Sequence, residues 1–113
     1  MRKDLKMTKG KYVAQGSHAS LGNVLRIQQG NNEKHKEVLN KWLSDAFVKV
    51  CLYVNSYEEL MEIYEKSMDA GHATTIIVDN GLTMFNGELT TTCLSILGYR
   101  DEVDEITGHL SLL

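Results

Sequence analysis

Apolar residues recur at helical spacing over two stretches in the first half of this chain. The first stretch predicts a helix from about Lys9 to Gln28, with an apolar face of Val13, Leu21, Val24 and Leu25. The Gly30-Asn31-Asn32 cluster ends it. The second predicts a helix from about Glu33 to Ala46, with an apolar face of Val38, Leu39, Trp42 and Leu43.

The period then changes to the alternation of a β-strand. From Phe47 to Asn55, Val48, Val50, Leu52 and Val54 alternate with Lys49, Cys51 and Tyr53. Two more strands are predicted from β-branched apolar runs, at Thr74 to Val78 and at Leu89 to Leu97. The turn residues Asp79-Asn80-Gly81 follow the first of these runs.

A third helix is predicted between these strands. Ser56-Tyr57-Glu58-Glu59 is a capping box that opens it, and Gly71 ends it. Its buried stripe is predicted to be Leu60, Met61, Tyr64 and Met68, and Asp101 to Ile106 predicts a short helical turn. Helices that alternate with strands predict an α/β fold, here a small mixed β-sheet of three to four strands flanked by helices on both faces in three layers.

Length and composition limit the class of protein. We expect 113 residues, 42% of them apolar and 24% charged, to form a single globular domain over residues 1–113. No run approaches the roughly 18 apolar residues of a membrane span, and no apolar segment of a signal peptide follows the basic N-terminus. We expect Cys51 and Cys93 to be buried free thiols in a reducing cytoplasm; no Cys/His spacing resembles a zinc site.

Positive charge is concentrated in the first eleven residues. Five basic side chains there face only Asp4, a local balance of +4, whereas the remaining chain carries −7. Thr8 is the expected N-cap of the first helix, and Lys11 takes the position where a capping box holds Glu. Because a helix N-terminus already carries positive partial charge, lysines there favour an anion site, with a phosphate as the natural guest.

Two groups of residues are candidates for chemistry. Lys11, Gln15 and His18 share one helix face and could bind and polarise an oxyanion, or could form an ordinary solvated polar face. Asp79 follows an apolar strand, where it could orient or deprotonate water, or could only form an Asx turn. Strand alternation predicts that Thr90 and Thr92 share one face of the last strand.

In order along the chain, these pieces resemble the archaeal/eukaryotic-type peptidyl-tRNA hydrolases and their bacterial and phage relatives. The likeness spans essentially the whole sequence. The motifs that carry it are Arg2-Lys3-Asp4-Leu5, Lys9-Gly10-Lys11 with Ala14-Gln15 and His18-Ala19, Trp42-Leu43, Ser56 with Glu58-Glu59-Leu60, Tyr64-Glu65-Lys66, Asp79 with Gly81 and Thr83, Thr92-Cys93-Leu94, and Asp104 with Thr107-Gly108-His109-Leu110.

The resemblance implies a compact α/β homodimer that hydrolyses the ester between a peptide and the 3′ end of tRNA in the cytoplasm, without a metal or cofactor and away from membranes. By matching position, it implies that Lys11, Asp79, Thr83 and Thr92 are the catalytic group. Gln15 and His18 would support the site. Arg2, Lys3 and Lys9 would contact the tRNA end.

Three departures from the family pattern bear on that expectation. An apolar strand usually precedes the motif at Arg2, and here only Met1 does, so either the start lies upstream or the sheet has lost most of one strand; over residues 1–113 we expect a domain short of its first strand. Val78 and Leu82 stand where the family loop has arginines, and Leu97-Gly98 replaces a Gly-Pro. Two alternatives therefore stay open: an inactive relative that binds protein or RNA, and a hydrolase of other acyl esters.

Overall fold

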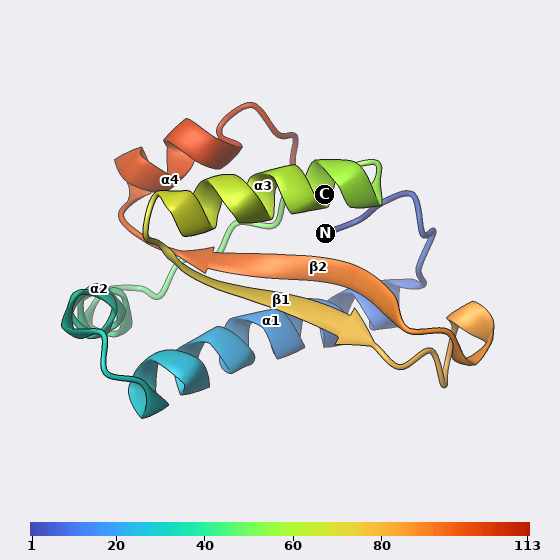
Figure 1. The fold of residues 1–113 in the computed structure, drawn as a ribbon, viewed down its shortest axis with the longest axis horizontal. Helices are drawn as coiled ribbons and strands as arrows, with labels where there is room; N and C mark the ends of the chain where they lie inside the picture. Colours follow the sequence, from blue (N-terminus) through green and yellow to red (C-terminus); the bar gives the residue numbers. More distant parts are fainter.

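The computed structural model describes residues 1–113 as an α/β fold of four helices and a two-stranded antiparallel sheet (Figure 1). The elements are α1 (Lys9–Gln29), α2 (Glu33–Ser44), α3 (Tyr57–Asp69), β1 (Ala73–Asp79), the 3-10 turn η1 (Phe85–Gly87), β2 (Thr90–Leu97) and α4 (Arg100–Thr107). In Figure 1, α1 lies on one side of the two strands and α3 and α4 lie on the other.

The helices begin where their capping residues predict. The Thr8 hydroxyl accepts a hydrogen bond from the Lys11 amide, and the Ser56 hydroxyl accepts one from the Glu59 amide. These bonds satisfy amides that a helix N-terminus leaves without a partner. Both predicted N-caps are therefore confirmed.

The predicted apolar face of α1 is wrong at three of its four residues, whose side chains are exposed, whereas Val24 is partly buried and packs against an apolar core cluster. Val13 is 69% exposed, Leu21 60% and Leu25 42%. The residues that are buried against the sheet are Gln15, Ala19, Asn23 and Ile27.

Hydrogen bonds explain why α1 buries a largely polar face. The Asn23 amide donates to the Ala73 carbonyl oxygen at 2.9 Å, and its oxygen accepts from the Thr75 hydroxyl at 3.1 Å. On β2, the Ser95 hydroxyl donates to the Ala19 carbonyl oxygen at 2.7 Å. The small residues Ala19 and Gly22 let the helix come close enough to the strands for these bonds.

The predicted strand from Phe47 to Asn55 is also wrong, so the sheet has two strands and not three or four. Only Leu52 and Val54 form isolated bridges, to Leu112 and Arg2 respectively. Residues 47–50 lie beside no strand, and Val48 and Val50 are 66% and 61% exposed. An alternating sequence forms a strand only where a neighbour supplies the hydrogen bonds, and residues 47–50 make no backbone–backbone hydrogen bond.

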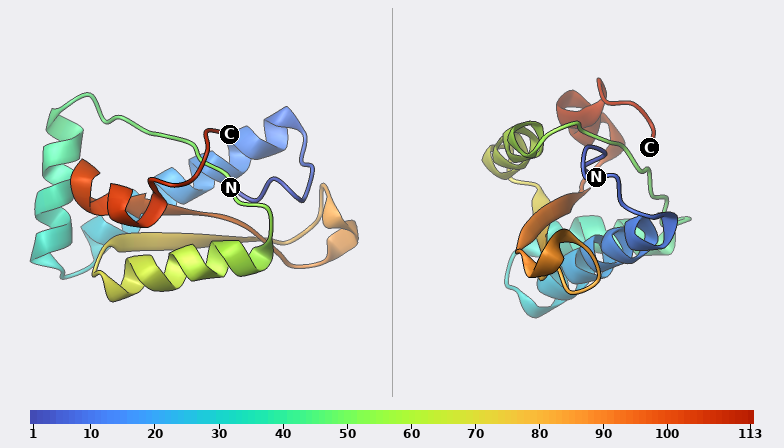
Figure 2. Two further views of the ribbon diagram at one scale, coloured as in Figure 1. Left: turned by 90° about the horizontal axis from the view of Figure 1, so that it is seen from above. Right: turned by 90° about the vertical axis from the view of Figure 1, so that its right-hand side faces the viewer.

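Both chain ends lie along this irregular segment, as the two views of Figure 2 agree. The Val54 amide donates to the Met1 carbonyl oxygen, and the Leu113 amide donates to the Cys51 carbonyl oxygen. On the other side of the N-terminal residues, the Arg2 amide donates to the Thr92 carbonyl oxygen of β2 at 2.9 Å. Cys51 is exposed here, contrary to prediction, whereas Cys93 is buried as predicted.

The apolar core is divided between the two sides of the sheet. Val54, Leu60, Ile63 and Ile106 form one cluster, and Ile27, Leu39 and Ala73 form the other. The buried stripe of α3 is Leu60, Ile63 and Ser67, so Met68, which is 48% exposed, does not belong to it as predicted.

Candidate functional site

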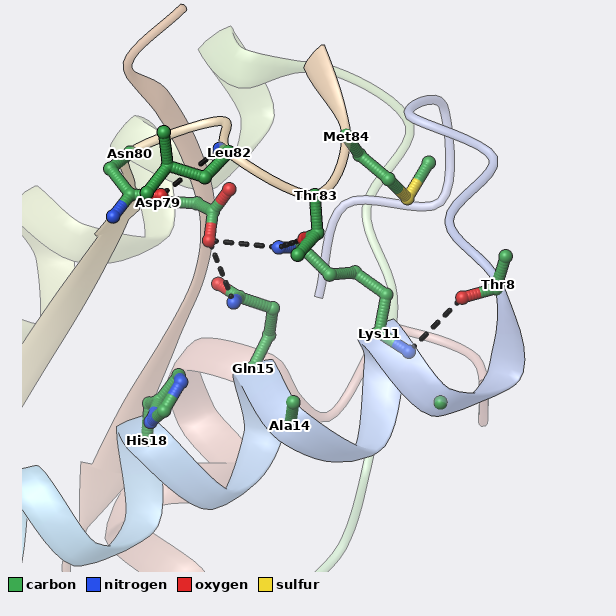
Figure 3. A pocket seen from close by; sticks show the side chains of 11 residues that line it. Thr8, Lys11, Ala14, Gln15, His18, Asp79, Asn80, Leu82, Thr83 and Met84 are labelled. Carbon is green, nitrogen blue, oxygen red and sulfur yellow. Dashed lines mark hydrogen bonds and ion pairs between the residues drawn. The ribbon is translucent and has the colours of Figure 1, made fainter. Parts of the chain in front are cut away.

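A cavity of about 650 Å³ lies between the first half of α1 and the loop that follows β1 (Figure 3). Helix α1 supplies one wall and the loop supplies the other. The lining residues are Thr8, Gly10, Lys11, Ala14, Gln15 and His18 from the helix side, and Asp79, Asn80, Leu82, Thr83 and Met84 from the loop side. The two groups of candidates that the sequence identifies separately are thus brought together.

An ion pair joins the two walls. The Lys11 Nζ lies 2.9 Å from Asp79 Oδ1, and each of the two side chains is only 11% exposed. Lys11 also donates to the Thr83 hydroxyl at 2.7 Å. An ammonium group has three protons, so one remains for a substrate oxygen.

Hydrogen bonds keep Asp79 ionised. The bond from Lys11 is the main reason that the pKa of Asp79 lies below its ordinary value, with smaller contributions from the Gly81 amide and Gln15, although burial acts in the opposite direction. The carboxylate is therefore available to accept a proton at neutral pH.

Asp79 also forms the Asx turn that the sequence leaves as an alternative. Its Oδ2 accepts a hydrogen bond from the Gly81 amide at 2.9 Å. Gly81 has φ +79°, and a Cβ there would lie 2.5 Å from the Glu88 carbonyl oxygen. Only glycine fits this position, so the turn that aims Asp79 at Lys11 depends on Gly81.

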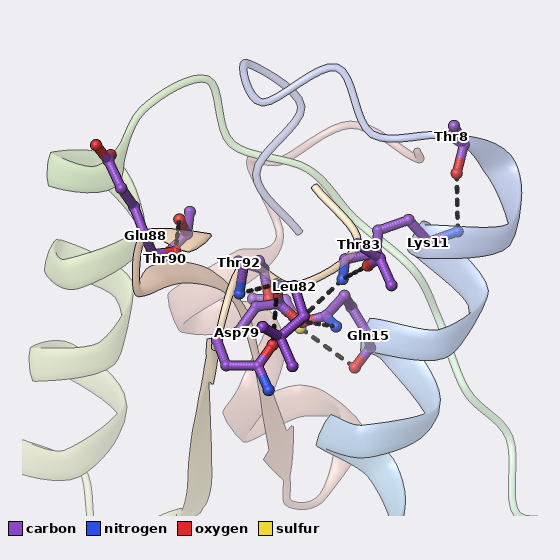
Figure 4. A network of polar contacts seen from close by, with 12 residues as sticks. Thr8, Lys11, Gln15, Asp79, Leu82, Thr83, Glu88, Thr90 and Thr92 are labelled. Atoms are coloured by element: carbon purple, nitrogen blue, oxygen red, sulfur yellow. Dashed lines mark hydrogen bonds and ion pairs between the residues drawn. The ribbon is translucent and has the colours of Figure 1, made fainter. Parts of the chain in front are cut away.

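Gln15 connects this pair to the interior of the sheet (Figure 4). Its Nε2 donates to Asp79 Oδ1 at 3.2 Å, and its Oε1 accepts from the Thr92 hydroxyl at 2.5 Å. Thr92 is fully buried. Its hydroxyl therefore contacts Gln15 and not the cavity.

A bulge in β2 places Thr92. The register pairs Ile77 with Cys93 but Val78 with Thr91, so Thr92 is an extra residue on β2. Cys93 and Thr92 both face α1: the Cys93 thiol donates to the Gln15 carbonyl oxygen at 3.4 Å. Strict alternation would turn Thr92 to the opposite face, and the bulge turns it to Gln15.

The other residues predicted for the site do not make direct contacts with the ion pair. His18 lines the cavity with an exposed side chain, and Lys9 is exposed at the start of α1. Arg2 is held outside the cavity, where it pairs with Asp4 at 2.7 Å and donates to the Thr91 carbonyl oxygen. Lys3 lies over the Tyr53 ring, also outside the cavity.

Sequence reasoning missed some of the lining residues. Ala14 lies three residues after Lys11 and four before His18, so helical spacing alone could have placed it on this face. Leu82 also lines the cavity, although the sequence marks it only as a departure from the family loop, and no pattern in the sequence marks Met84.

No three His, Cys, Asp or Glu side chains lie close enough together to hold a metal ion. None of the helices has the length and apolar character that crossing a membrane requires.

Comparison with known proteins gives a consistent result. The family model described as "Peptidyl-tRNA hydrolase PTH2" matches residues 1–113. The chain is 43% identical to a peptidyl-tRNA hydrolase of Sulfurisphaera tokodaii over 100% of this chain and 93% of that protein. It is 40% identical to one from Methanothermobacter thermautotrophicus, covering 100% and 95%, and 39% identical to one from Nanoarchaeum equitans, covering 96% and 90%.

Proposed function

We propose a mechanism for this chain, which belongs to the PTH2 family of peptidyl-tRNA hydrolases. In this mechanism, Lys11, Asp79 and Thr83 hydrolyse the ester that joins a peptide to the 3′ end of tRNA. The observation that carries the assignment is the ion pair between Lys11 and Asp79 at 2.9 Å in the wall of a cavity. No observation favours the inactive alternative.

The chemistry follows from the proton that Asp79 can accept and the proton that Lys11 can still donate in a hydrogen bond. Asp79 removes a proton from a water molecule as the water oxygen attacks the ester carbonyl carbon. The third proton of Lys11 stabilises the oxyanion that forms. When the bond to the 3′ oxygen breaks, the proton held by Asp79 passes to that oxygen, and free tRNA and peptide leave. The Thr83 hydroxyl accepts from Lys11, so its own proton is free to bind the ribose or the water.

The start of α1 is the proposed site for the phosphate nearest the ester. Lys9 is exposed there, Gly10 lines the cavity, and the helix N-terminus adds positive partial charge. Arg2 and Lys3 lie outside the cavity, so we propose that they contact tRNA beyond its 3′ end. As a translation enzyme, the protein would act in the cytoplasm.

Thr92 is better described as a positioning residue than as a catalytic one. Its buried hydroxyl donates to Gln15, and Gln15 in turn donates to Asp79. This chain of bonds fixes which atom of the Gln15 amide faces the carboxylate. We propose that Thr92 acts on the reaction only through Gln15.

Replacing Thr92 with valine is expected to lower kcat about tenfold with KM within twofold of wild type, because the amide of Gln15 loses its fixed orientation. Thr92→Ser keeps the hydroxyl and is expected to restore most of the activity. Steady-state hydrolysis of one peptidyl-tRNA by the three proteins measures this. An equal loss in the serine and valine variants would show that packing, and not the hydroxyl, matters.

We further propose that the exposed face of α1 forms a homodimer interface. Val13, Leu21 and Leu25 lie along this face, and no Asp, Glu, Lys or Arg occurs between Lys11 and Arg26. A surface that is apolar and free of charge is typical of an interface core.

Replacing Leu21 with glutamate is expected to give a monomer, because a charge buried in an apolar interface core would lose its water without gaining an opposite charge. Light scattering after size exclusion measures the mass. Glu65→Leu changes an exposed residue of α3 and is a control that should leave the mass unchanged. A wild-type protein of 12.7 kDa at all concentrations would contradict the dimer.

The direct test of the function is release of peptide from peptidyl-tRNA by the purified protein, measured beside small acyl esters. We expect turnover of peptidyl-tRNA and little of the esters, since only the tRNA substrate fills the basic start of α1. Turnover of small esters alone would favour the other acyl hydrolase. Absence of all turnover from folded protein would contradict the proposed enzyme.

A further inference from the structure

The two ends of the cavity differ in charge. One end, at the start of α1, has Thr8, Gly10 and the neighbouring Lys9. At the other end, Ala14 and His18 lie on the helix side and Asn80 and Leu82 lie on the loop side, so none of these four residues is an Asp, Glu, Lys or Arg (Figure 3). The ion pair of Lys11 with Asp79 lies between the two ends.

Leu82 is held in place although its side chain is 81% exposed. Its amide donates to Asn80 Oδ1 at 3.1 Å, and the Gly87 amide closes the loop on the Gly81 carbonyl oxygen at 2.9 Å. A single exposed leucine is ordinary on a protein surface. This one lies on a fixed turn next to the reacting carboxylate, so a substrate bound at Asp79 must pass beside it.

The negative charge of the phosphate then determines which way round the substrate binds in the cavity. The ester lies at the centre, where Lys11 and Asp79 act on it. The nucleotide side carries the phosphate and lies at the basic end. The side chain of the esterified amino acid is left for the opposite end, which presents the methyl groups of Ala14 and Leu82 and the imidazole ring of His18.

We propose that Ala14, His18 and Leu82 form a subsite for the side chain of the amino acid esterified to tRNA, and that this subsite favours uncharged side chains. The proposal rests on the proposed function and adds a substrate preference to it. None of these three residues is an Asp, Glu, Lys or Arg that could pair with a charged side chain, whereas Ala14 and Leu82 offer apolar contacts to an uncharged one.

The test uses one tRNA body that carries N-acetyl-leucine, N-acetyl-lysine or N-acetyl-aspartate, so that only the amino acid differs. Wild-type kcat/KM is expected to be about fivefold higher for leucine than for either charged residue. Leu82→Asp should raise the lysine-to-leucine ratio about fivefold, and Leu82→Lys should raise the aspartate-to-leucine ratio by a similar factor.

The opposite signs of these two variants separate a subsite from general damage to the loop. Leu89→Asp is the matched control: Leu89 is 77% exposed at the end of the same loop but does not line the cavity, so all ratios should stay at their wild-type values. Equal kcat/KM for the three substrates, or ratios that the two Leu82 variants leave unchanged, would overturn the subsite alone. No hydrolysis of any of the three would overturn the proposed function, and the subsite with it.

Discussion

Replacing Lys11 with methionine is expected to lower kcat for peptide release about a thousandfold, the loss typical of a removed oxyanion donor. Methionine has a similar length and no charge, so the cavity keeps its shape. The variant also removes the ammonium group whose Nζ pairs with Asp79 Oδ1 at 2.9 Å. Single-turnover hydrolysis at saturating enzyme measures the chemical step without the binding step.

Lys41→Met is the control for this variant. Lys41 is an exposed lysine of α2 whose only ion pair is with Asp45, so its loss should leave kcat unchanged. Circular dichroism should show that both variants keep the helical content of wild type. A Lys11→Met enzyme within threefold of wild type would show that Lys11 does not stabilise the reacting oxygen.

Replacing Asp79 with asparagine is expected to lower kcat by about a thousandfold or more, within the upper part of the range for a general base. Asparagine keeps the shape of the side chain, and its oxygen can still accept from Lys11, but it cannot take a proton from water. Asp69→Asn, at the exposed end of α3, should leave kcat unchanged. Combining Asp79→Asn with Lys11→Met should cost little more than either change alone, because the pair acts as a unit.

The pH dependence of the wild-type enzyme follows from the same pair. The pKa of Asp79 is lowered in the folded protein, mainly by the bond from Lys11. The carboxylate therefore stays ionised as the pH falls through the ordinary range of aspartate, and kcat/KM should fall only at more acidic pH. The stability that this bond contributes is fully present above the pKa of unfolded aspartate and is lost as pH falls through the lowered pKa.

In Lys11→Met, the residual activity should lose its acid tolerance. The main cause of the lowered pKa is gone, while burial still favours the neutral acid, so the acid limb of kcat/KM moves to higher pH. Residual rates measured between pH 4 and 8 would show this shift. An acid limb that stays in place would mean that it reports a group other than Asp79.

The pattern of residues in the sequence is sufficient to identify both partners of the ion pair, Lys11 and Asp79, although they lie 68 positions apart. The lysine was conspicuous because it breaks the rule for a capping box, and the aspartate because it follows an apolar strand. The contact itself could not be derived from spacing. It depends on how α1 crosses the strands, which is a property of the folded chain.

The errors in the fold have a common cause. Apolar periodicity assigns Val13 and Leu21 to the interior, yet the strands offer α1 hydrogen-bonding groups at Ala73 and Thr75 that Asn23 satisfies. Alternation assigns Val48 to a strand, yet no neighbouring chain pairs with it. In both cases the outcome depends on a partner elsewhere in the fold, which a local pattern does not contain.

Thr92 shows the same limit on a smaller scale. Alternation predicts its face from its neighbours, and the bulge adds one residue that changes the face. The family resemblance marked the residue, but only the register showed that its hydroxyl reaches the site through Gln15. A threonine that looks like a strand former in the sequence is thus part of the polar network.

The hydrogen-bonded docking of α1 also determines how accurately the enzyme can aim its lysine. Apolar contacts have no direction, and a helix that rests on them can slide or roll by small amounts at little cost. The bonds of Asn23 and Ala19 to the two strands allow one rotation and one axial position. Lys11 lies two to three turns nearer the helix N-terminus and inherits that position. The position of Lys11 in the cavity is therefore determined in part by hydrogen bonds that lie outside the cavity.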